Sequence, residues 1–148
     1  MRANALIAMV LLSAVTSVAP VGAADKKPLI IEGTARVIDA GTLQIDKNVI
    51  RLFGIVAPGP RQKCLRGSLP WLCGAAARTY LVELADGKQA RCEAVESFNA
   101  RCIVGDRDLS NEMVRAGWAV ADEAGTAYLP AEEKARAAKR GLWEYAPE

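Results

Sequence analysis

Two neighbouring stretches decide the fold of this chain: ARVIDAGTL at residues 35–43 and VIRLFGIVAPG at residues 49–59. Apolar residues alternate loosely over residues 29–38, a pattern typical of a β-strand. Turn-forming residues at 39–42 lead into a second alternating segment at 43–46, and the pair Lys47-Asn48 forms a tight turn into a third apolar segment. The sequence therefore predicts a three-stranded meander with short connections.

The rest of the chain is predicted to form a loop, a helix, a hairpin and two C-terminal helices, at residues 57–70, about 72–85, 89–95 with 99–104, about 108–117, and from 129 onward. Asp108 or Ser110 is expected to cap the second helix, and Pro130 suits the first turn of the third. Together these elements predict an α+β domain, a five-stranded OB-fold β-barrel with about three packed helices.

Residues 1–24 have the pattern of a secretory signal peptide. Arg2 supplies a positive charge, residues 5–15 are apolar and uncharged, and Gly22-Ala23-Ala24 fits a small-residue cleavage site. The apolar run is shorter than the ~20 residues that a membrane-spanning helix needs. We therefore expect cleavage near Ala23 or Ala24, a periplasmic or secreted protein, and one domain at residues 25–148 with a modest core.

The charge balance and the lack of histidine exclude several kinds of chemistry. The chain has 19 Lys and Arg residues, 17 Asp and Glu residues and no His, for a net charge of +2. Such a small excess is not the charge signature of non-specific nucleic-acid binding. Without histidine, neither a Ser-His-Asp nor a Cys-His catalytic centre nor a histidine-ligated zinc site is possible.

The four cysteines, Cys64, Cys73, Cys92 and Cys102, all follow the signal segment. An even number of cysteines in an exported domain favours two disulfides. The absence of a close Cys-x-x-Cys pair and of histidine argues against zinc. Three pairings are possible in principle; we prefer Cys64–Cys73, which closes a loop, and Cys92–Cys102, which joins two neighbouring strands.

The two opening stretches resemble the active-site segment of the staphylococcal nuclease (thermonuclease, SNase-like) family, which has approximately the pattern Val-Ile-Asp-Gly-Asp-Thr-Leu followed by Val-Arg-Leu-x-Gly-Ile-Asp-Ala-Pro-Glu. The matching residues are Asp39, Thr42, Arg51, Leu52, Gly54, Ile55, Ala57 and Pro58. Trp71-x-Cys73-Gly74, Met113 to Ala119 and Gly141-Leu142-Trp143 are similar to its exported bacterial branch. The resemblance spans most of the mature chain and implies the same barrel.

The resemblance also implies that catalytic residues have been lost. Active members bind one calcium ion through two aspartates and use a glutamate to activate water. In this chain those aspartate positions are Gly41 and Val56, and the glutamate position is Gly59. Asp39 remains, but it matches the more peripheral acid of the turn. We therefore expect no metal site and no cofactor, although the active family uses calcium.

Active family members also hold the phosphate with two arginines. Arg51 is at the first of these positions and the second falls on Ser97, unless a shifted register places Arg101 there. We expect Arg51 to be paired with a neighbouring acid or carbonyl rather than to bind an anion. A second group of possible anion-binding residues, expected to lie on a solvated loop, consists of Arg61, Lys63 and Arg66.

These observations predict an exported, catalytically inactive SNase-like domain, a monomer that acts as a binding or structural module in the cell envelope with an unknown partner. One alternative is a divergent metal-dependent nuclease or phosphodiesterase that cleaves DNA or RNA at a relocated site, built from Asp39, Asp46, Arg51 and the pair Asp122-Glu123. Another is a nucleic-acid or anion binder that does not cleave.

We expect the three tryptophans, Trp71, Trp118 and Trp143, to pack in the core or on helices rather than to stack on bases.

Overall fold

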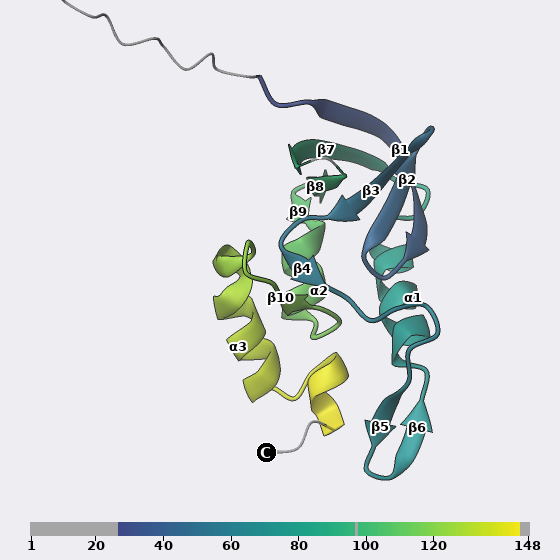
Figure 1. Cartoon of the computed structure of the whole chain (residues 1–148), viewed down its shortest axis with the longest axis vertical. Coiled ribbons are helices and arrows are strands. Elements are labelled where there is room, and N and C mark those ends of the chain that lie inside the picture. Colours follow the sequence, from purple (N-terminus) through teal and green to yellow (C-terminus); the bar gives the residue numbers. More distant parts are fainter. Residues whose placement is uncertain (1–26, 97, 146–148) are drawn as a thin grey trace, which may run out of the picture.

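A computed structural model describes residues 27–96 and 98–145 (Figure 1). The predicted signal segment, residues 1–24, and Ser97 lie outside these described residues. Within the described part of the chain, no helix has the length and apolar character needed to cross a membrane.

Five strands form a closed barrel: β1 (Ile30–Asp39), β2 (Thr42–Ile45), β3 (Asn48–Leu52), β7 (Gln89–Glu96) and β8 (Asn99–Val104). Antiparallel pairs run in the order β3-β2-β1-β7-β8, and β9 (Arg107–Asp108) extends the sheet beyond β8. A parallel pairing of β3 with β8 closes the barrel, with Arg51 opposite Asn99 and Leu52 opposite Ala100. The predicted meander, hairpin and fold class are confirmed.

Two helices, α1 (Cys73–Ala85) and α2 (Leu109–Arg115), pack against the barrel, and α3 (Leu129–Ala137) packs against α2. Single-turn 3₁₀ segments, η1 (Thr126–Tyr128) and η2 (Gly141–Tyr145), flank α3, and the short strands β4 (Ile55–Val56) and β10 (Val120–Ala121) pair with each other. Asp108 is the cap of α2, because its side chain accepts a hydrogen bond from the Asn111 amide at 3.1 Å. Figure 1 shows α1 on one side of the molecule and α3 on the other.

One hydrophobic core lies between the barrel and the helices. Leu43 and Ile45 point inward from alternate positions of β2, and both are fully buried. Leu81 of α1 and Met113 of α2 are fully buried against the same cluster. The period-two and helical patterns of the sequence therefore converge on a single core, as expected for a domain of this length.

The prediction of an irregular loop over residues 57–70 is partly wrong, since β5 (Cys64–Arg66) and β6 (Leu69–Trp71) form a separate two-stranded hairpin. Gly67 allows the tight turn because its φ of +62° lies in the left-handed region. A two-stranded hairpin is marginally stable by itself. Here the Cys64–Cys73 disulfide ties its base to the start of α1.

Both disulfides have the pairing preferred from the sequence. Cys64 is bonded to Cys73, and Cys92 is bonded to Cys102. Cys92 and Cys102 face each other directly in the β7–β8 register, so this bond fixes the alignment of two neighbouring barrel strands. The first bond holds the hairpin and the second lies within the barrel wall.

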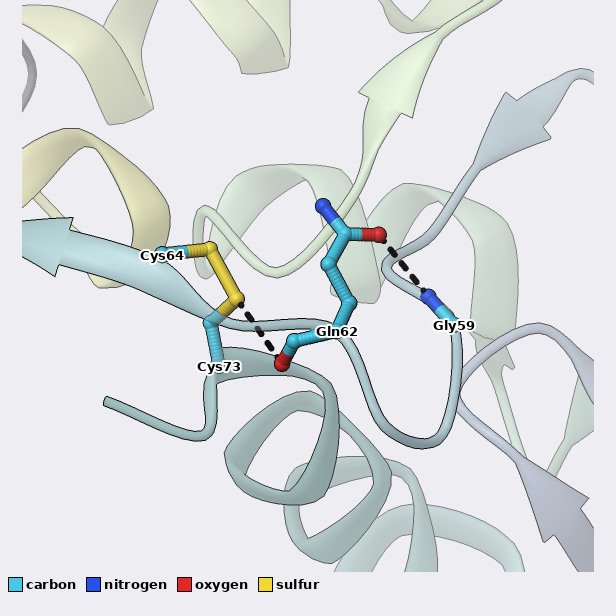
Figure 2. The surroundings of a disulfide bond; sticks show 4 residues. All are labelled: Gly59, Gln62, Cys64 and Cys73. Carbon is cyan, nitrogen blue, oxygen red and sulfur yellow. Dashed lines mark hydrogen bonds between the residues drawn. A yellow bond between two sulfur atoms is a disulfide. The ribbon is translucent and has the colours of Figure 1, made fainter. Parts of the chain in front are cut away.

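The segment that precedes the hairpin packs its backbone directly onto the first turn of α1. A Cβ atom at Gly74 would lie 1.8 Å from the carbonyl oxygen of Gly59. The Gly74 amide donates to the Gln62 carbonyl at 3.3 Å. The Gly59 amide donates to the Gln62 side chain at 3.1 Å, and the same Gln62 carbonyl lies beside the Cys73 sulfur (Figure 2). Only glycine at position 74 permits this approach.

Replacing Gly74 by Ala tests this backbone contact. The added methyl group has no room, so we expect the free energy of unfolding to fall by about 1–3 kcal/mol, although alanine is the better helix former. Gly59→Ala is the matched control, because its Cβ would meet nothing within 4 Å. It should change stability by no more than about 0.5 kcal/mol. Urea unfolding gives the free energy of unfolding of both variants. Equal midpoints would contradict the close packing of Gly74 on the Gly59 backbone.

Candidate functional site

A cavity of about 490 Å³ opens where the β1–β2 turn, the β3–β4 segment and the start of β8 meet. Its lining includes the positions that the resemblance assigns to the acids, the base and the first arginine: Asp39, Gly41, Arg51, Val56 and Gly59. The barrel therefore brings residues from two sequence stretches, 35–43 and 49–59, into one site, although these stretches belong to different strands. Ser97, the position expected for a second arginine, lies outside the described residues.

The three positions that lack carboxylates have space for side chains. A Cβ atom at Gly41 would make ordinary contacts, 3.5 Å from the Ala57 Cβ and 4.0 Å from an Asp39 carboxylate oxygen. A Cβ atom at Gly59 would meet nothing within 4 Å, and Val56 is 58% exposed. Neither glycine has a φ in the left-handed region. The backbone there accommodates larger residues, so what is missing is the side-chain chemistry.

The donor set does not fit the calcium ion that the resemblance implies. Calcium requires about 6–8 oxygen ligands, and Gly41 and Val56 supply no side-chain oxygen. The Asp39 carboxylate accepts a hydrogen bond from the Gly41 amide at 2.9 Å. The Asp122 carboxylate accepts from the Ala124 and Gly125 amides at 2.8 and 2.9 Å. Within residues 27–96 and 98–145, no three Asp, Glu, Cys or His residues are grouped so that they could hold a metal ion.

Carboxylates outnumber cations in the cavity. Arg51 is exposed, and its guanidinium makes no hydrogen bond or ion pair with any residue that the structure describes, so the expected partner is not found there. Three acids, Asp39, Glu96 and Asp122, line the same space. One positive charge among three negative charges gives a net negative potential, which disfavours a phosphate ligand.

Glu96 and Asn99 are cavity residues that sequence reasoning missed. Both lie at the turn end of the β7–β8 hairpin, beside position 97, which the resemblance assigns to a second arginine. Asn99 reaches the site because the parallel β3–β8 pairing places it opposite Arg51. The resemblance marks this turn only through Ser97 and assigns no role to either neighbour.

The acids proposed for a relocated site do not all converge. Asp39, Arg51 and Asp122 line the cavity, whereas Asp46 and Glu123 are not among its lining residues. Asp46 follows β2 and Asp39 precedes it, so the two acids lie at opposite ends of that strand. The set expected for a divergent nuclease is therefore split between two places.

The remaining basic candidates also lie outside the cavity. Arg101, the alternative second arginine, stacks on the Phe53 ring with 5.4 Å between its guanidinium carbon and the ring centroid. Arg61 and Lys63 are exposed on the segment before β5, and neither lines the cavity. Arg66 lies over the rings of Trp71 and Tyr145, at 5.4 and 4.5 Å from the centroids. None of these four cations is among the residues that line the cavity.

The tryptophans have packing contacts, as expected from the sequence. Trp71 meets Trp118 edge to face, with 6.2 Å between the ring centroids. The Arg136 guanidinium lies 4.0 Å above the Trp143 ring, and Glu132 holds the same arginine on α3. None of the three rings lines the cavity. They stabilise the helices and the hairpin and offer no platform for a base at this site.

Tyr128 and Asp108 fix the wall behind the cavity. The Tyr128 hydroxyl donates to Asp108 at 3.0 Å, and its ring lies against Gly54, a cavity residue. Burial is the main cause that raises the pKa of Tyr128 above its ordinary value of 10.0. The phenol therefore stays neutral at physiological pH and acts as a structural donor.

Comparison with known proteins identifies one family. The model for "Staphylococcal nuclease homologue" matches residues 49–145. No curated protein matches the chain. The matched range includes Arg51, Val56 and Gly59, and it extends from the third strand of the meander through η2.

The double substitution Gly41→Asp with Val56→Asp tests whether the site lacks only the side-chain oxygen ligands for calcium. The two carboxylates would supply the absent oxygens, so calcium should stabilise this variant. At a calcium concentration about tenfold above Kd the gain is about 1.4 kcal/mol, which raises Tm by roughly 3–6 °C. Thermal unfolding with calcium and with chelator measures the effect.

The control for this experiment is Gly41→Asn with Val56→Asn, which has the same shape without the charge. For the control and for the unchanged protein, Tm should be the same with calcium and with chelator. A shift in the unchanged protein would contradict the donor-set argument. No shift in the aspartate variant would show that the backbone has diverged as well.

Proposed function

Because the chain belongs to the staphylococcal nuclease homologue family, we propose that it is a catalytically inactive member that acts as a binding or structural module in the cell envelope. One observation carries the proposal. The cavity keeps the walls of the site, but its positions for two metal ligands and the base are Gly41, Val56 and Gly59.

The missing groups supply most of the rate in this kind of chemistry. A positioned general base contributes roughly 10²–10⁴-fold, and electrostatic stabilisation of the transition state is usually the largest single contribution. Gly59 cannot accept a proton from water through a side chain. Arg51 would face developing phosphoryl charge with three acids in the same cavity. Cleavage at this site would therefore be close to the uncatalysed rate.

Non-cleaving nucleic-acid binding is the second candidate, and the unpaired guanidinium of Arg51 is the observation in its favour. Such binding rests on phosphate neutralisation by several cations. In the cavity Arg51 is the single cation beside Asp39, Glu96 and Asp122. This balance makes the candidate weaker than an inactive domain with a different partner.

The envelope role rests on the predicted signal segment and on the disulfides. Cys64–Cys73 and Cys92–Cys102 both need an oxidising compartment to persist. A periplasmic or secreted protein meets this requirement. We expect the mature chain to be a monomer without a cofactor.

A cleavage assay tests catalytic inactivity. Fluorescent single- and double-stranded DNA and RNA are incubated with the oxidised protein that begins at residue 25, with calcium, magnesium, manganese or chelator. We expect no cleavage above buffer. Arg51→Ala is the control for a contaminating nuclease, which would be equally active in that preparation. Metal-dependent cleavage that Arg51→Ala abolishes would overturn the proposal.

Fluorescence anisotropy with the same oligonucleotides tests the binding candidate. We expect no saturable binding at physiological salt, because the cavity has net negative charge. Arg107→Gln, a change of an exposed arginine on β9, is the matched control for Arg51→Gln. Saturable binding that weakens steeply with salt and is lost in Arg51→Gln alone would favour the nucleic-acid binder.

A further inference from the structure

The β5–β6 hairpin combines exposed leucines with basic side chains. It lies at one end of the molecule, far from the start of β1 (Figure 1). Leu65 and Leu69 on the hairpin are 63% and 68% exposed, and Leu72 at its base is 53% exposed. Exposed leucines that gather on one projection usually mark an interaction surface.

The tip of the hairpin carries little charge. Arg66 and Leu69 face each other beside the Gly67-Ser68 turn, and Leu65 faces Pro70 one step further along. Arg66 is the single charged residue of this tip, and its guanidinium stacks on Trp71 and Tyr145. The side chains left at the turn are aliphatic or small, so the tip is an apolar wedge.

A cationic collar, formed by Arg61 and Lys63, lies on the segment that leads into the base of this wedge. Arg61 and Lys63 are exposed, and neither forms a hydrogen bond or ion pair with any described residue. The sequence contains no acidic residue between Asp46 and Glu83. The neighbouring η2 adds one carboxylate, Glu144, which leaves a net positive charge around the hairpin.

The wedge is held rigidly before it meets any partner. The Cys64–Cys73 disulfide closes the hairpin at its base, and a side-chain hydrogen bond of Gln62 joins the collar segment to Gly59 (Figure 2). The Gly74 amide donates to the Gln62 carbonyl. Trp71 packs edge to face on Trp118. A preformed projection loses little conformational entropy when it binds.

We propose that the hairpin docks on the surface of an anionic lipid bilayer, with Leu65 and Leu69 in the headgroup and upper acyl region and with Arg61 and Lys63 on the phosphates. An apolar tip bordered by lysine or arginine is the pattern of a membrane-interface element. Nucleic acid fits less well, because aliphatic leucines do not stack on bases. This docking rests on the proposed envelope role and gives it a partner.

Vesicle co-sedimentation tests the docking with the oxidised protein that begins at residue 25. Vesicles of phosphatidylcholine with one-third phosphatidylglycerol are compared with pure phosphatidylcholine, at low and high salt. We expect binding to the anionic vesicles that weakens with salt. Leu65→Ser with Leu69→Ser should lower the partition coefficient at least about tenfold. Arg61→Gln with Lys63→Gln should lower it by about fivefold for each charge removed.

Matched controls come from other exposed positions. Leu129→Ser on α3 and Arg107→Gln on β9 make the same changes elsewhere and should bind as the unchanged protein does. Urea unfolding checks that each hairpin variant keeps its fold, which is expected because the altered side chains are exposed.

Three outcomes would overturn the docking. The first is no binding to anionic vesicles. The second is binding that the leucine changes leave intact, which means electrostatic adsorption without insertion. The third is binding of a fluorescent oligonucleotide through Arg61 and Lys63 without vesicle binding, which assigns the collar to nucleic acid. Catalytic inactivity is tested separately by the cleavage assay, so either proposal can fail alone.

Discussion

The parallel pairing of β3 with β8 is the constraint on which the site depends. It places Arg51 opposite Asn99 and Leu52 opposite Ala100, although these residues are far apart in the sequence. The Arg51 amide donates to the Phe98 carbonyl at 2.8 Å, and the Phe53 amide donates to the Ala100 carbonyl at 3.0 Å. Closing the barrel this way removes two exposed strand edges and satisfies their backbone groups. It also forms one wall of the cavity. Without the β3–β8 pairing, the turn beside Asp39 would have no opposite cavity wall.

The residues that form the core differ from those at the positions that the family pattern assigns to catalysis, so the barrel does not depend on carboxylates at those positions. Leu43, Leu81 and Met113 are fully buried, and loss of such side chains typically costs about 2–5 kcal/mol. Val56 and Gly59 are exposed at the cavity mouth. Carboxylates at such positions repel one another unless a metal ion is bound, so uncharged residues there do not weaken the barrel.

Local patterns predicted most of the fold, and long-range contacts account for what they missed. The alternation around Leu43 and Ile45 identified the meander, and Asp108 was one of two caps expected for α2. The β5–β6 hairpin was missed because the prolines and glycines of residues 57–70 indicate a loop, while its stability comes from a disulfide and from stacking on Tyr145. That Gly41, Val56 and Gly59 line one cavity followed from the family pattern. The charge of the cavity did not, because Glu96 reaches it only through barrel closure.

The two disulfides differ in how far a thiol reductant can reach them. Cys92 and Cys102 are fully buried between paired strands, whereas Cys64 is half-buried at the base of the hairpin. Thiol–disulfide exchange needs access to a sulfur atom, so reducing agents attack the hairpin bond first. The barrel keeps its cross-link at that stage and the wedge loses the bond that holds it in shape. A reducing environment therefore cleaves the disulfide of the β5–β6 hairpin before it cleaves the disulfide of the barrel.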